Sequence, residues 1–155
     1  MKPFLKAYYN TVASLADRET YSFWEHYFHA SPHKTHEEAW FLMDTRWMLY
    51  MERGTGLELL AGIPRAWLED GKRIELKNVA TYFGPLSLEV VANGKRVEAT
   101  VTCQTERKPA YVELRLPHPS GRAAIAATGG RYDARTERIR IEPFDGRAKV
   151  VLEFQ

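Results

Sequence analysis

A carboxylate among aromatic side chains is the first feature of this sequence that could do chemistry. Glu25 lies in the run Phe23-Trp24-Glu25-His26-Tyr27-Phe28. Rings stack on the faces of sugars, and apolar surroundings raise the pKa of a carboxyl group toward that of a general acid. Trp24, Glu25 and His26 are therefore candidates for the rim of a glycan pocket. The alternative is a solvated or salt-bridged Glu25 beside rings that pack between helices. No second carboxylate completes an acid–base pair, so the sequence assigns no catalytic residue.

Two further rings are weaker candidates for binding a carbohydrate. Trp67, in Pro64-Arg65-Ala66-Trp67-Leu68, follows a predicted strand at 57–63 and would be either a sugar platform or a wedge between strands and helices. Tyr111 is expected on the wet face of its strand. A carbohydrate-binding module usually presents two or three aligned rings, so the single ring of Tyr111 is a weak basis for one. For Trp67 the wedge is the favoured interpretation.

The histidines and the single cysteine do not form a predicted metal or redox site. His26-x-x-His29 and His33-x-x-His36 have a spacing that can place two metal ligands on one helix face. Pro32 interrupts the segment and no acidic ligand completes a known pattern, so hydrogen-bonded loop histidines are the better interpretation. His118 is also expected in a loop. Cys103 falls on the inward series of its strand and is expected to be a buried, inert thiol. No metal or cofactor is predicted.

Charge and hydropathy exclude two classes of partner. The net charge is +2, from 22 basic and 20 acidic residues, without a dense basic run that would indicate nucleic acid. No apolar run approaches the ~20 residues of a membrane-spanning helix. Residues 1–6 do not resemble a signal peptide, because no apolar segment follows them. The compartment, cytoplasmic or exported, is left open.

Periodicity divides the chain into a helical segment, 1–53, and a strand-rich domain, 57–155. Apolar residues repeat at three and four over 3–16, which predicts an amphipathic helix. Residues 20–34 are compatible with a short helix or a long loop. A further helix is predicted over 36–52, with Thr35 and Glu38 as a capping box. After Gly56 the pattern alternates.

Short alternating segments predict an antiparallel β-sandwich of about eight strands, preceded by two or three α-helices. The fold class is thus mainly β with N-terminal helices. Asn93-Gly94 and Asp145-Gly146 are each expected to close a hairpin. The inward positions are expected to hold Val, Leu, Ile and Ala.

The predicted helix 36–52 carries apolar residues on nearly every side. Trp40, Met43, Trp47 and Tyr50 form one stripe, and most of the remaining surface is also apolar; the residues concerned are Phe41, Leu42, Met48, Leu49 and Met51. A surface helix has one apolar stripe and one polar face. This helix is therefore expected to be buried on several sides, against more helical material than this chain offers.

The stretch from Leu57 to Leu76, with Ala61-Gly62-Ile63-Pro64-Arg65-Ala66-Trp67 near its start, is distinctive. With Thr81-Tyr82-Phe83-Gly84-Pro85-Leu86-Ser87 it resembles the C-terminal end of large bacterial six-hairpin glycosidase-like proteins. The resemblance implies an (α/α)6 toroid that carries the catalytic carboxylates, closed by a β-sandwich. Residues 20–26 would be a toroid loop, and helix 36–52 the last toroid helix. Most of the toroid would then lie upstream of residue 1.

Three functional hypotheses follow. The first is a non-catalytic C-terminal structural module of a bacterial glycoside-hydrolase-like protein, whose partner is an upstream catalytic domain and whose loop residues border a glycan pocket. The second is a carbohydrate-binding module that uses Trp67 or Tyr111. The third is a scaffold or interaction domain that self-associates, or meets a helical partner, through helix 36–52.

Overall fold

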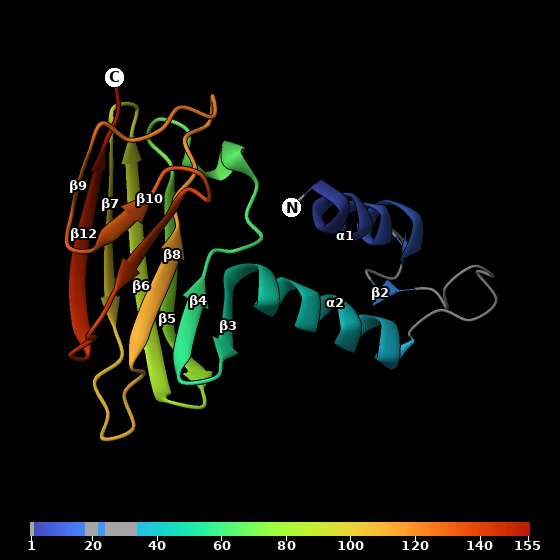
Figure 1. Ribbon diagram of the computed structural model, residues 1–155. Helices are drawn as coiled ribbons and strands as arrows, with labels where there is room; N and C mark the ends of the chain where they lie inside the picture. Colours follow the sequence, from blue (N-terminus) through green and yellow to red (C-terminus); the bar gives the residue numbers. More distant parts are fainter. Residues whose placement is uncertain (1, 18–21, 24–33) are drawn as a thin grey trace.

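A computed structural model describes residues 2–17, 22–23 and 34–155. It shows a helical arm that projects from one side of a β-sandwich (Figure 1). The arm consists of α1 (Lys2–Leu15), the short paired strands β1 (Ala16–Asp17) and β2 (Ser22–Phe23), and α2 (Thr35–Leu49). This arrangement confirms the mainly β fold class, a sandwich preceded by helices.

The two helices pack through aromatic side chains. The Tyr8 ring of α1 stacks on Phe41 of α2, with ring centroids 5.3 Å apart, and its hydroxyl lies 3.0 Å from the Thr45 hydroxyl. Phe41 also contacts Phe23 of β2, with centroids 5.0 Å apart. The helix predicted over 3–16 is confirmed, because α1 spans Lys2–Leu15. Its three-and-four repeat places Tyr8 on the side that faces α2.

Both ends of α2 differ from the sequence prediction. The N-cap residue is Lys34, which makes no side-chain capping bond, so the Thr35–Glu38 capping box is wrong. A tertiary contact replaces it, since the Glu38 carboxylate accepts a hydrogen bond from the Ser22 hydroxyl. The helix ends at Leu49 rather than at residue 52, because residues 50–53 form a strand.

Ten strands, β3 to β12, build the sandwich. The first sheet has the order β10-β11-β8-β4-β3 and the second the order β5-β6-β7-β12-β9. Their bounds, with the 3₁₀-helix η1, are β3 (Tyr50–Arg53), β4 (Gly56–Leu59), η1 (Arg65–Leu68), β5 (Arg73–Thr81), β6 (Gly84–Asn93), β7 (Arg96–Thr102), β8 (Tyr111–Arg115), β9 (Ala126–Thr128), β10 (Arg131–Asp133), β11 (Arg138–Ile141) and β12 (Arg147–Glu153). Within the described ranges, the β4–β8 pair is parallel and the other strand pairs are antiparallel.

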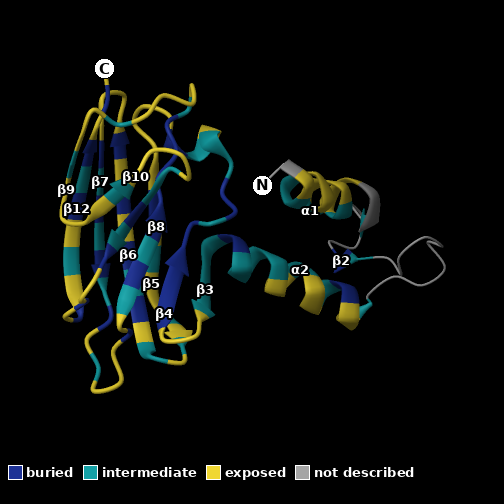
Figure 2. Cartoon of the chain, in the orientation of Figure 1, coloured by how far each residue is buried: buried dark blue, intermediate teal, exposed yellow. Residues whose placement is uncertain are grey.

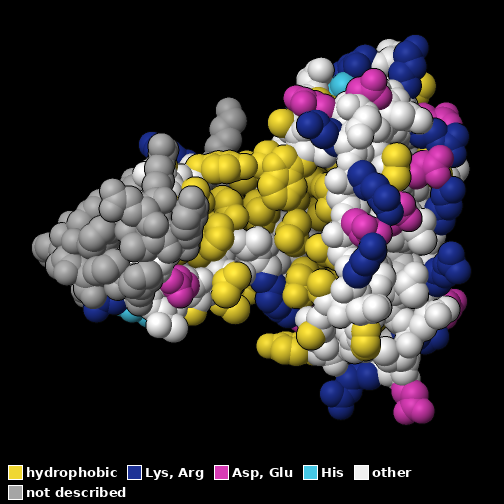
Figure 3. All heavy atoms as spheres, turned by 180° about the vertical axis from the view of Figure 1, so that it is seen from behind, with side chains coloured by type: hydrophobic (Ala, Val, Ile, Leu, Met, Phe, Trp, Pro, Cys, Tyr) yellow, Lys and Arg dark blue, Asp and Glu magenta, His cyan; other side chains and the backbone are white. Residues whose placement is uncertain are grey.

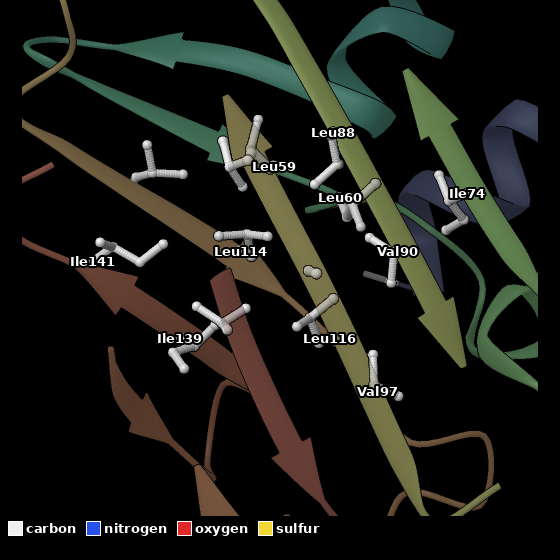
Figure 4. Packing of buried hydrophobic residues seen from close by; sticks show 14 of the residues in the cluster. Leu59, Leu60, Ile74, Leu88, Val90, Val97, Leu114, Leu116, Ile139 and Ile141 are labelled. Carbon is white, nitrogen blue, oxygen red and sulfur yellow. The ribbon is translucent and has the colours of Figure 1, made fainter. Parts of the chain in front are cut away.

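The alternation predicted along the strands matches the observed burial (Figure 2). Leu88 and Val90 of the second sheet face the layer that Leu114 and Ile139 contribute from the first (Figure 4). Cys103 is fully buried in the same cluster, as predicted. The sheets therefore hold each other together through a continuous apolar layer, in the manner of β-sandwiches.

The two predicted hairpin turns have different outcomes. Asn93-Gly94 lies at the turn between β6 and β7, with Gly94 at φ +59°, so this hairpin is confirmed. Asp145-Gly146 connects β11 of the first sheet to β12 of the second, and the hairpin predicted there is wrong. A positive-φ Asp-Gly turn suits either connection. Burial decides between the two connections, because the apolar side chains of β11 and β12 enter the core from opposite sheets.

Candidate functional site

The predicted glycan-rim residues Trp24, Glu25 and His26 lie outside the described residues. So do His29 and His33 of the two histidine pairs. The rim therefore stays a prediction. The other candidates, Trp67 and Tyr111, are both described.

Tyr111 lies on the outer face of the first sheet but its ring is already in contact with neighbouring groups. The Arg140 guanidinium lies 3.6 Å from the ring centroid, and the hydroxyl donates to the Arg53 carbonyl at 3.3 Å. The ring also lies against Gly56, where an added Cβ would come within 2.2 Å of the Tyr111 Cζ atom. These contacts give Tyr111 a structural role that joins β4, β8 and β11.

A network of ion pairs covers the same face of the sheet. Glu58 of β4 and Glu113 of β8 stand opposite each other, and Arg138 of β11 bridges them. Burial disfavours the charged form of Arg138, but the hydrogen bonds and charges of the two glutamates outweigh it and raise the pKa of Arg138. Sequence analysis missed this network, although Glu and Arg at alternate strand positions are its signature. Two adjacent carboxylates held by one guanidinium form a structural cluster.

A second cluster fixes the segment between β4 and η1. Arg115 donates to the Ile63 carbonyl and pairs with Glu137, each at 3.0 Å, and Arg65 pairs with the other Glu137 oxygen. Burial lowers the pKa of Arg115, and Glu137 opposes that effect. Arg65 also donates to the carbonyl of His118, 2.8 Å away. The position of η1, and with it of Trp67, is therefore set by this cluster.

His118 lies in a loop, as predicted, but only 4% of its surface is exposed. Its ring packs against Phe154, with centroids 4.8 Å apart, and its Nδ1 accepts from the Ser120 backbone N–H. Burial and the nearby Arg122 lower the pKa of His118. A neutral, packed imidazole of this kind stabilises the loop.

Trp67 lies where η1, the end of α2 and the edge strand β5 meet. It packs partly on the core and lines a cavity of about 510 Å³, which we call the Trp67 cavity. The apolar lining is Leu49, Ala66, Trp67, Ile74 and Leu76. The charged lining is Glu69, Lys72, Arg73 and Glu75. Trp67 therefore packs on the core of the sandwich and is also a wall of an open site, and its predicted role as a wedge against the arm stays a prediction.

The outer face of α2 is a second apolar feature. Trp40 is 60% exposed and Met43 39%, and Leu42, which lies about 160° round the helix from Trp40, is 66% exposed. Tyr9 and Val12 of α1 are exposed as well. Seen from behind, hydrophobic side chains gather on the part of the arm next to the sandwich and at the corner where the two meet (Figure 3). The sequence predicted that this helix is buried on several sides. The structure shows α1 covering one side, while the outer face is exposed.

Arg46 and Glu52 hold the arm in place. The Arg46 guanidinium binds both carboxylate oxygens of Glu52, which also accepts the backbone N–H of Tyr82 at the β5–β6 turn. Burial alone would raise the pKa of Glu52, but these hydrogen bonds outweigh it and lower that pKa. The pair thus links α2, β3 and the second sheet.

Among the described residues, no group of three or more His, Cys, Asp or Glu side chains is arranged to hold a metal ion. Neither α1 nor α2, as described, combines the length and apolarity that crossing a membrane requires. Comparisons with models of protein families, with curated proteins and with solved structures find no match to this chain.

Proposed function

We propose that this protein is a non-catalytic structural module of a bacterial glycoside-hydrolase-like protein, and that its helical arm packs against a helical domain. The proposal is carried by one observation, the exposed apolar face of α2. The resemblance of residues 57–87 to the sandwich that closes six-hairpin glycosidases supports it further.

The exposed face of α2 has the spacing of a helix-packing surface. Trp40 and Met43, which are exposed, and Trp47, which is half-buried, follow one another at three and four residues and form a stripe along one side of the helix, the pattern of a helix-packing surface. α1 already occupies a different side of α2 through the same kind of aromatic contact, the Tyr8–Phe41 stack. Exposed apolar patches of this kind mark interaction sites. A helical occupant therefore continues the packing that α1 begins.

Three of the described carboxylates support a structural role. Glu58 and Glu113 are joined by Arg138, and Glu52 is joined to Arg46. A general acid has a raised pKa and a proton to give, whereas the pKa of Glu52 is lowered. These groups fix strands and the arm relative to one another.

Site-specific photo-cross-linking tests the proposal. Met43 is replaced by p-benzoylphenylalanine in the native host. Ile125 serves as the matched control because it is 63% exposed and directly precedes β9, the edge strand of the second sheet opposite to β5. We expect position 43 to cross-link to an amphipathic helix of a glycoside-hydrolase-like domain, and position 125 not to do so. Cross-links from position 43 only to a second copy of this chain would overturn the proposal in favour of a self-associating scaffold. Hydrolysis of glycosides by this chain alone, lost in Glu25→Gln, would overturn its non-catalytic part.

A further inference from the structure

We infer that the Trp67 cavity binds a neutral saccharide. The inference is independent of the docking of α2, because it rests on a different set of residues. Three elements within residues 49–76 supply the walls: the end of α2, the 3₁₀-helix η1 and the edge strand β5. At about 510 Å³ the cavity lies within the range of about 300–1,000 Å³ that holds small-molecule ligands.

The apolar wall offers a flat surface for a sugar ring. The backbone N–H of Trp67 donates to the Pro64 carbonyl at 3.1 Å, which holds the residue in η1, and its side chain packs partly on the core. Ile74 and Leu76 extend the apolar surface along β5. The C–H face of a pyranose is apolar and flat, so it stacks on an indole with little loss of conformational freedom.

The charged lining supplies both kinds of hydrogen-bonding partner. Glu69 and Glu75 accept hydrogen bonds, and Lys72 and Arg73 donate them. Arg73 pairs at 3.0 Å with both Glu75 and Glu89, so Glu69 and Lys72 are the better placed of the four to bind a hydroxyl. Sugar hydroxyls donate and accept equally well, so they satisfy both sets.

The same lining argues against other ligands. Two acidic and two basic groups give the site no net charge, so an anion meets two carboxylates and a cation meets two positive side chains. A purely apolar ligand would remove charged groups from water without replacing their hydrogen bonds. A neutral polyol with one apolar face fits both walls.

Two-dimensional ¹⁵N NMR on the full chain tests the site. The probes are glucose, galactose, mannose, N-acetylglucosamine, cellobiose, maltose and lactose, each added to millimolar concentration. We expect at least one of them to shift the Trp67 indole N–H and the amides of residues 66–76 in a saturable manner, with the exposed Trp40 indole unchanged. No shift at Trp67 with any of the seven sugars, or equal shifts at both indoles, would overturn the inference.

Rim variants separate binding from folding. Lys72 and Glu69 are exposed, so Lys72→Ala and Glu69→Gln are expected to leave the protein folded, as judged by its NMR spectrum. Each substitution should weaken saccharide affinity about tenfold, the loss typical of a charged hydrogen bond. Lys149→Ala, on the outer face of β12, is the control and keeps the affinity of the parent chain. Unchanged affinity in both rim variants would overturn the assignment. Cross-linking at Met43 tests the docking of α2 and not saccharide binding, so each proposal can be overturned without the other.

Discussion

Arg46 Nη2 lies 2.7 Å from each carboxylate oxygen of Glu52. The Glu52 side chain is only 5% exposed, and one of its oxygens also accepts the Tyr82 backbone N–H at 3.0 Å. A buried carboxylate that is fully hydrogen-bonded is costly to leave without its partners. The orientation of the arm therefore depends on a charged contact as well as on apolar packing.

The stability of the protein should depend on pH through Glu52. Its pKa in the folded state lies below the ordinary value of 4.5. Its contribution is therefore complete above about pH 4.5 and is lost as the pH falls through the folded-state pKa. We expect Glu52→Gln to lower the free energy of unfolding by about 1.5–3 kcal/mol at pH 7. The deficit should shrink at pH 3, as measured by urea unfolding.

Glu69→Gln is the matched control for this prediction. Glu69 is exposed, so its substitution should change the unfolding free energy by no more than about 0.5 kcal/mol at either pH. If Glu52→Gln behaved like Glu69→Gln at both pH values, the Arg46–Glu52 pair would not be a determinant of stability.

Gly56 should tolerate no larger side chain while Tyr111 is present. An added Cβ would come within 2.2 Å of the ring, so we expect Gly56→Ala to cost about 1–3 kcal/mol of stability. In a Tyr111→Ala background the ring is gone and the same change should cost less, with a coupling of about 1 kcal/mol in a double-mutant cycle of thermal or urea unfolding. Strictly additive costs would show that the cost of Gly56→Ala does not come from the Tyr111 ring.

The strand pattern was predictable because burial alternates along β6, β7 and β12 in step with the sequence. The end of α2 was not, because Tyr50 and Met51 continue the apolar pattern of the helix although they pair with β4. Pairing with a strand is a tertiary effect that local propensity does not contain. The parallel β4–β8 pair joins residues more than fifty positions apart and leaves no local trace in the sequence.

The candidate site was predictable only in part, for the same reason. Trp67 could be singled out by its residue type and its place after a strand. Leu49 and Ile74, which complete the cavity around it, come from segments on either side of it in the chain and meet it only in the folded protein. Ion pairs between strands, such as Arg138 with Glu113, depend on register, which alternation alone does not fix.

Gly62 should control how closely the arm approaches the sandwich. A Cβ at this position would lie 2.9 Å from the Met48 Cα and 3.0 Å from the Phe4 ring, in contact with both helices. We expect Gly62→Ala to push the arm outward and to speed hydrogen exchange in α1 and α2. The amides of β6 and β7 should exchange as before and serve as the internal control. Unchanged protection in α2 would mean that the contact is easily relaxed.

Two methionines on different sides of α2 should differ in how much the same substitution destabilises the protein. Met43 is 39% exposed, so Met43→Lys should change stability by no more than about 0.5 kcal/mol. It should also reduce the fluorescence of a bound apolar dye such as ANS. Met48 is 1% exposed, and Met48→Lys places a charge in the core and should destabilise the chain by more than about 3 kcal/mol. A large loss of stability in Met43→Lys would show that the outer face is covered within the chain itself.

The Asp145-Gly146 connection has a consequence for the order of events during synthesis. It delivers β12 into the interior of the second sheet, where β12 pairs with β7 on one side and β9 on the other. The strands β5, β6 and β7 therefore emerge from the ribosome while the outer edge of β7 is unpaired. That edge forms its hydrogen bonds only after residues 147–153 have been made. Until then the nascent chain carries an open strand edge, which is the kind of surface that chaperones and neighbouring nascent chains engage.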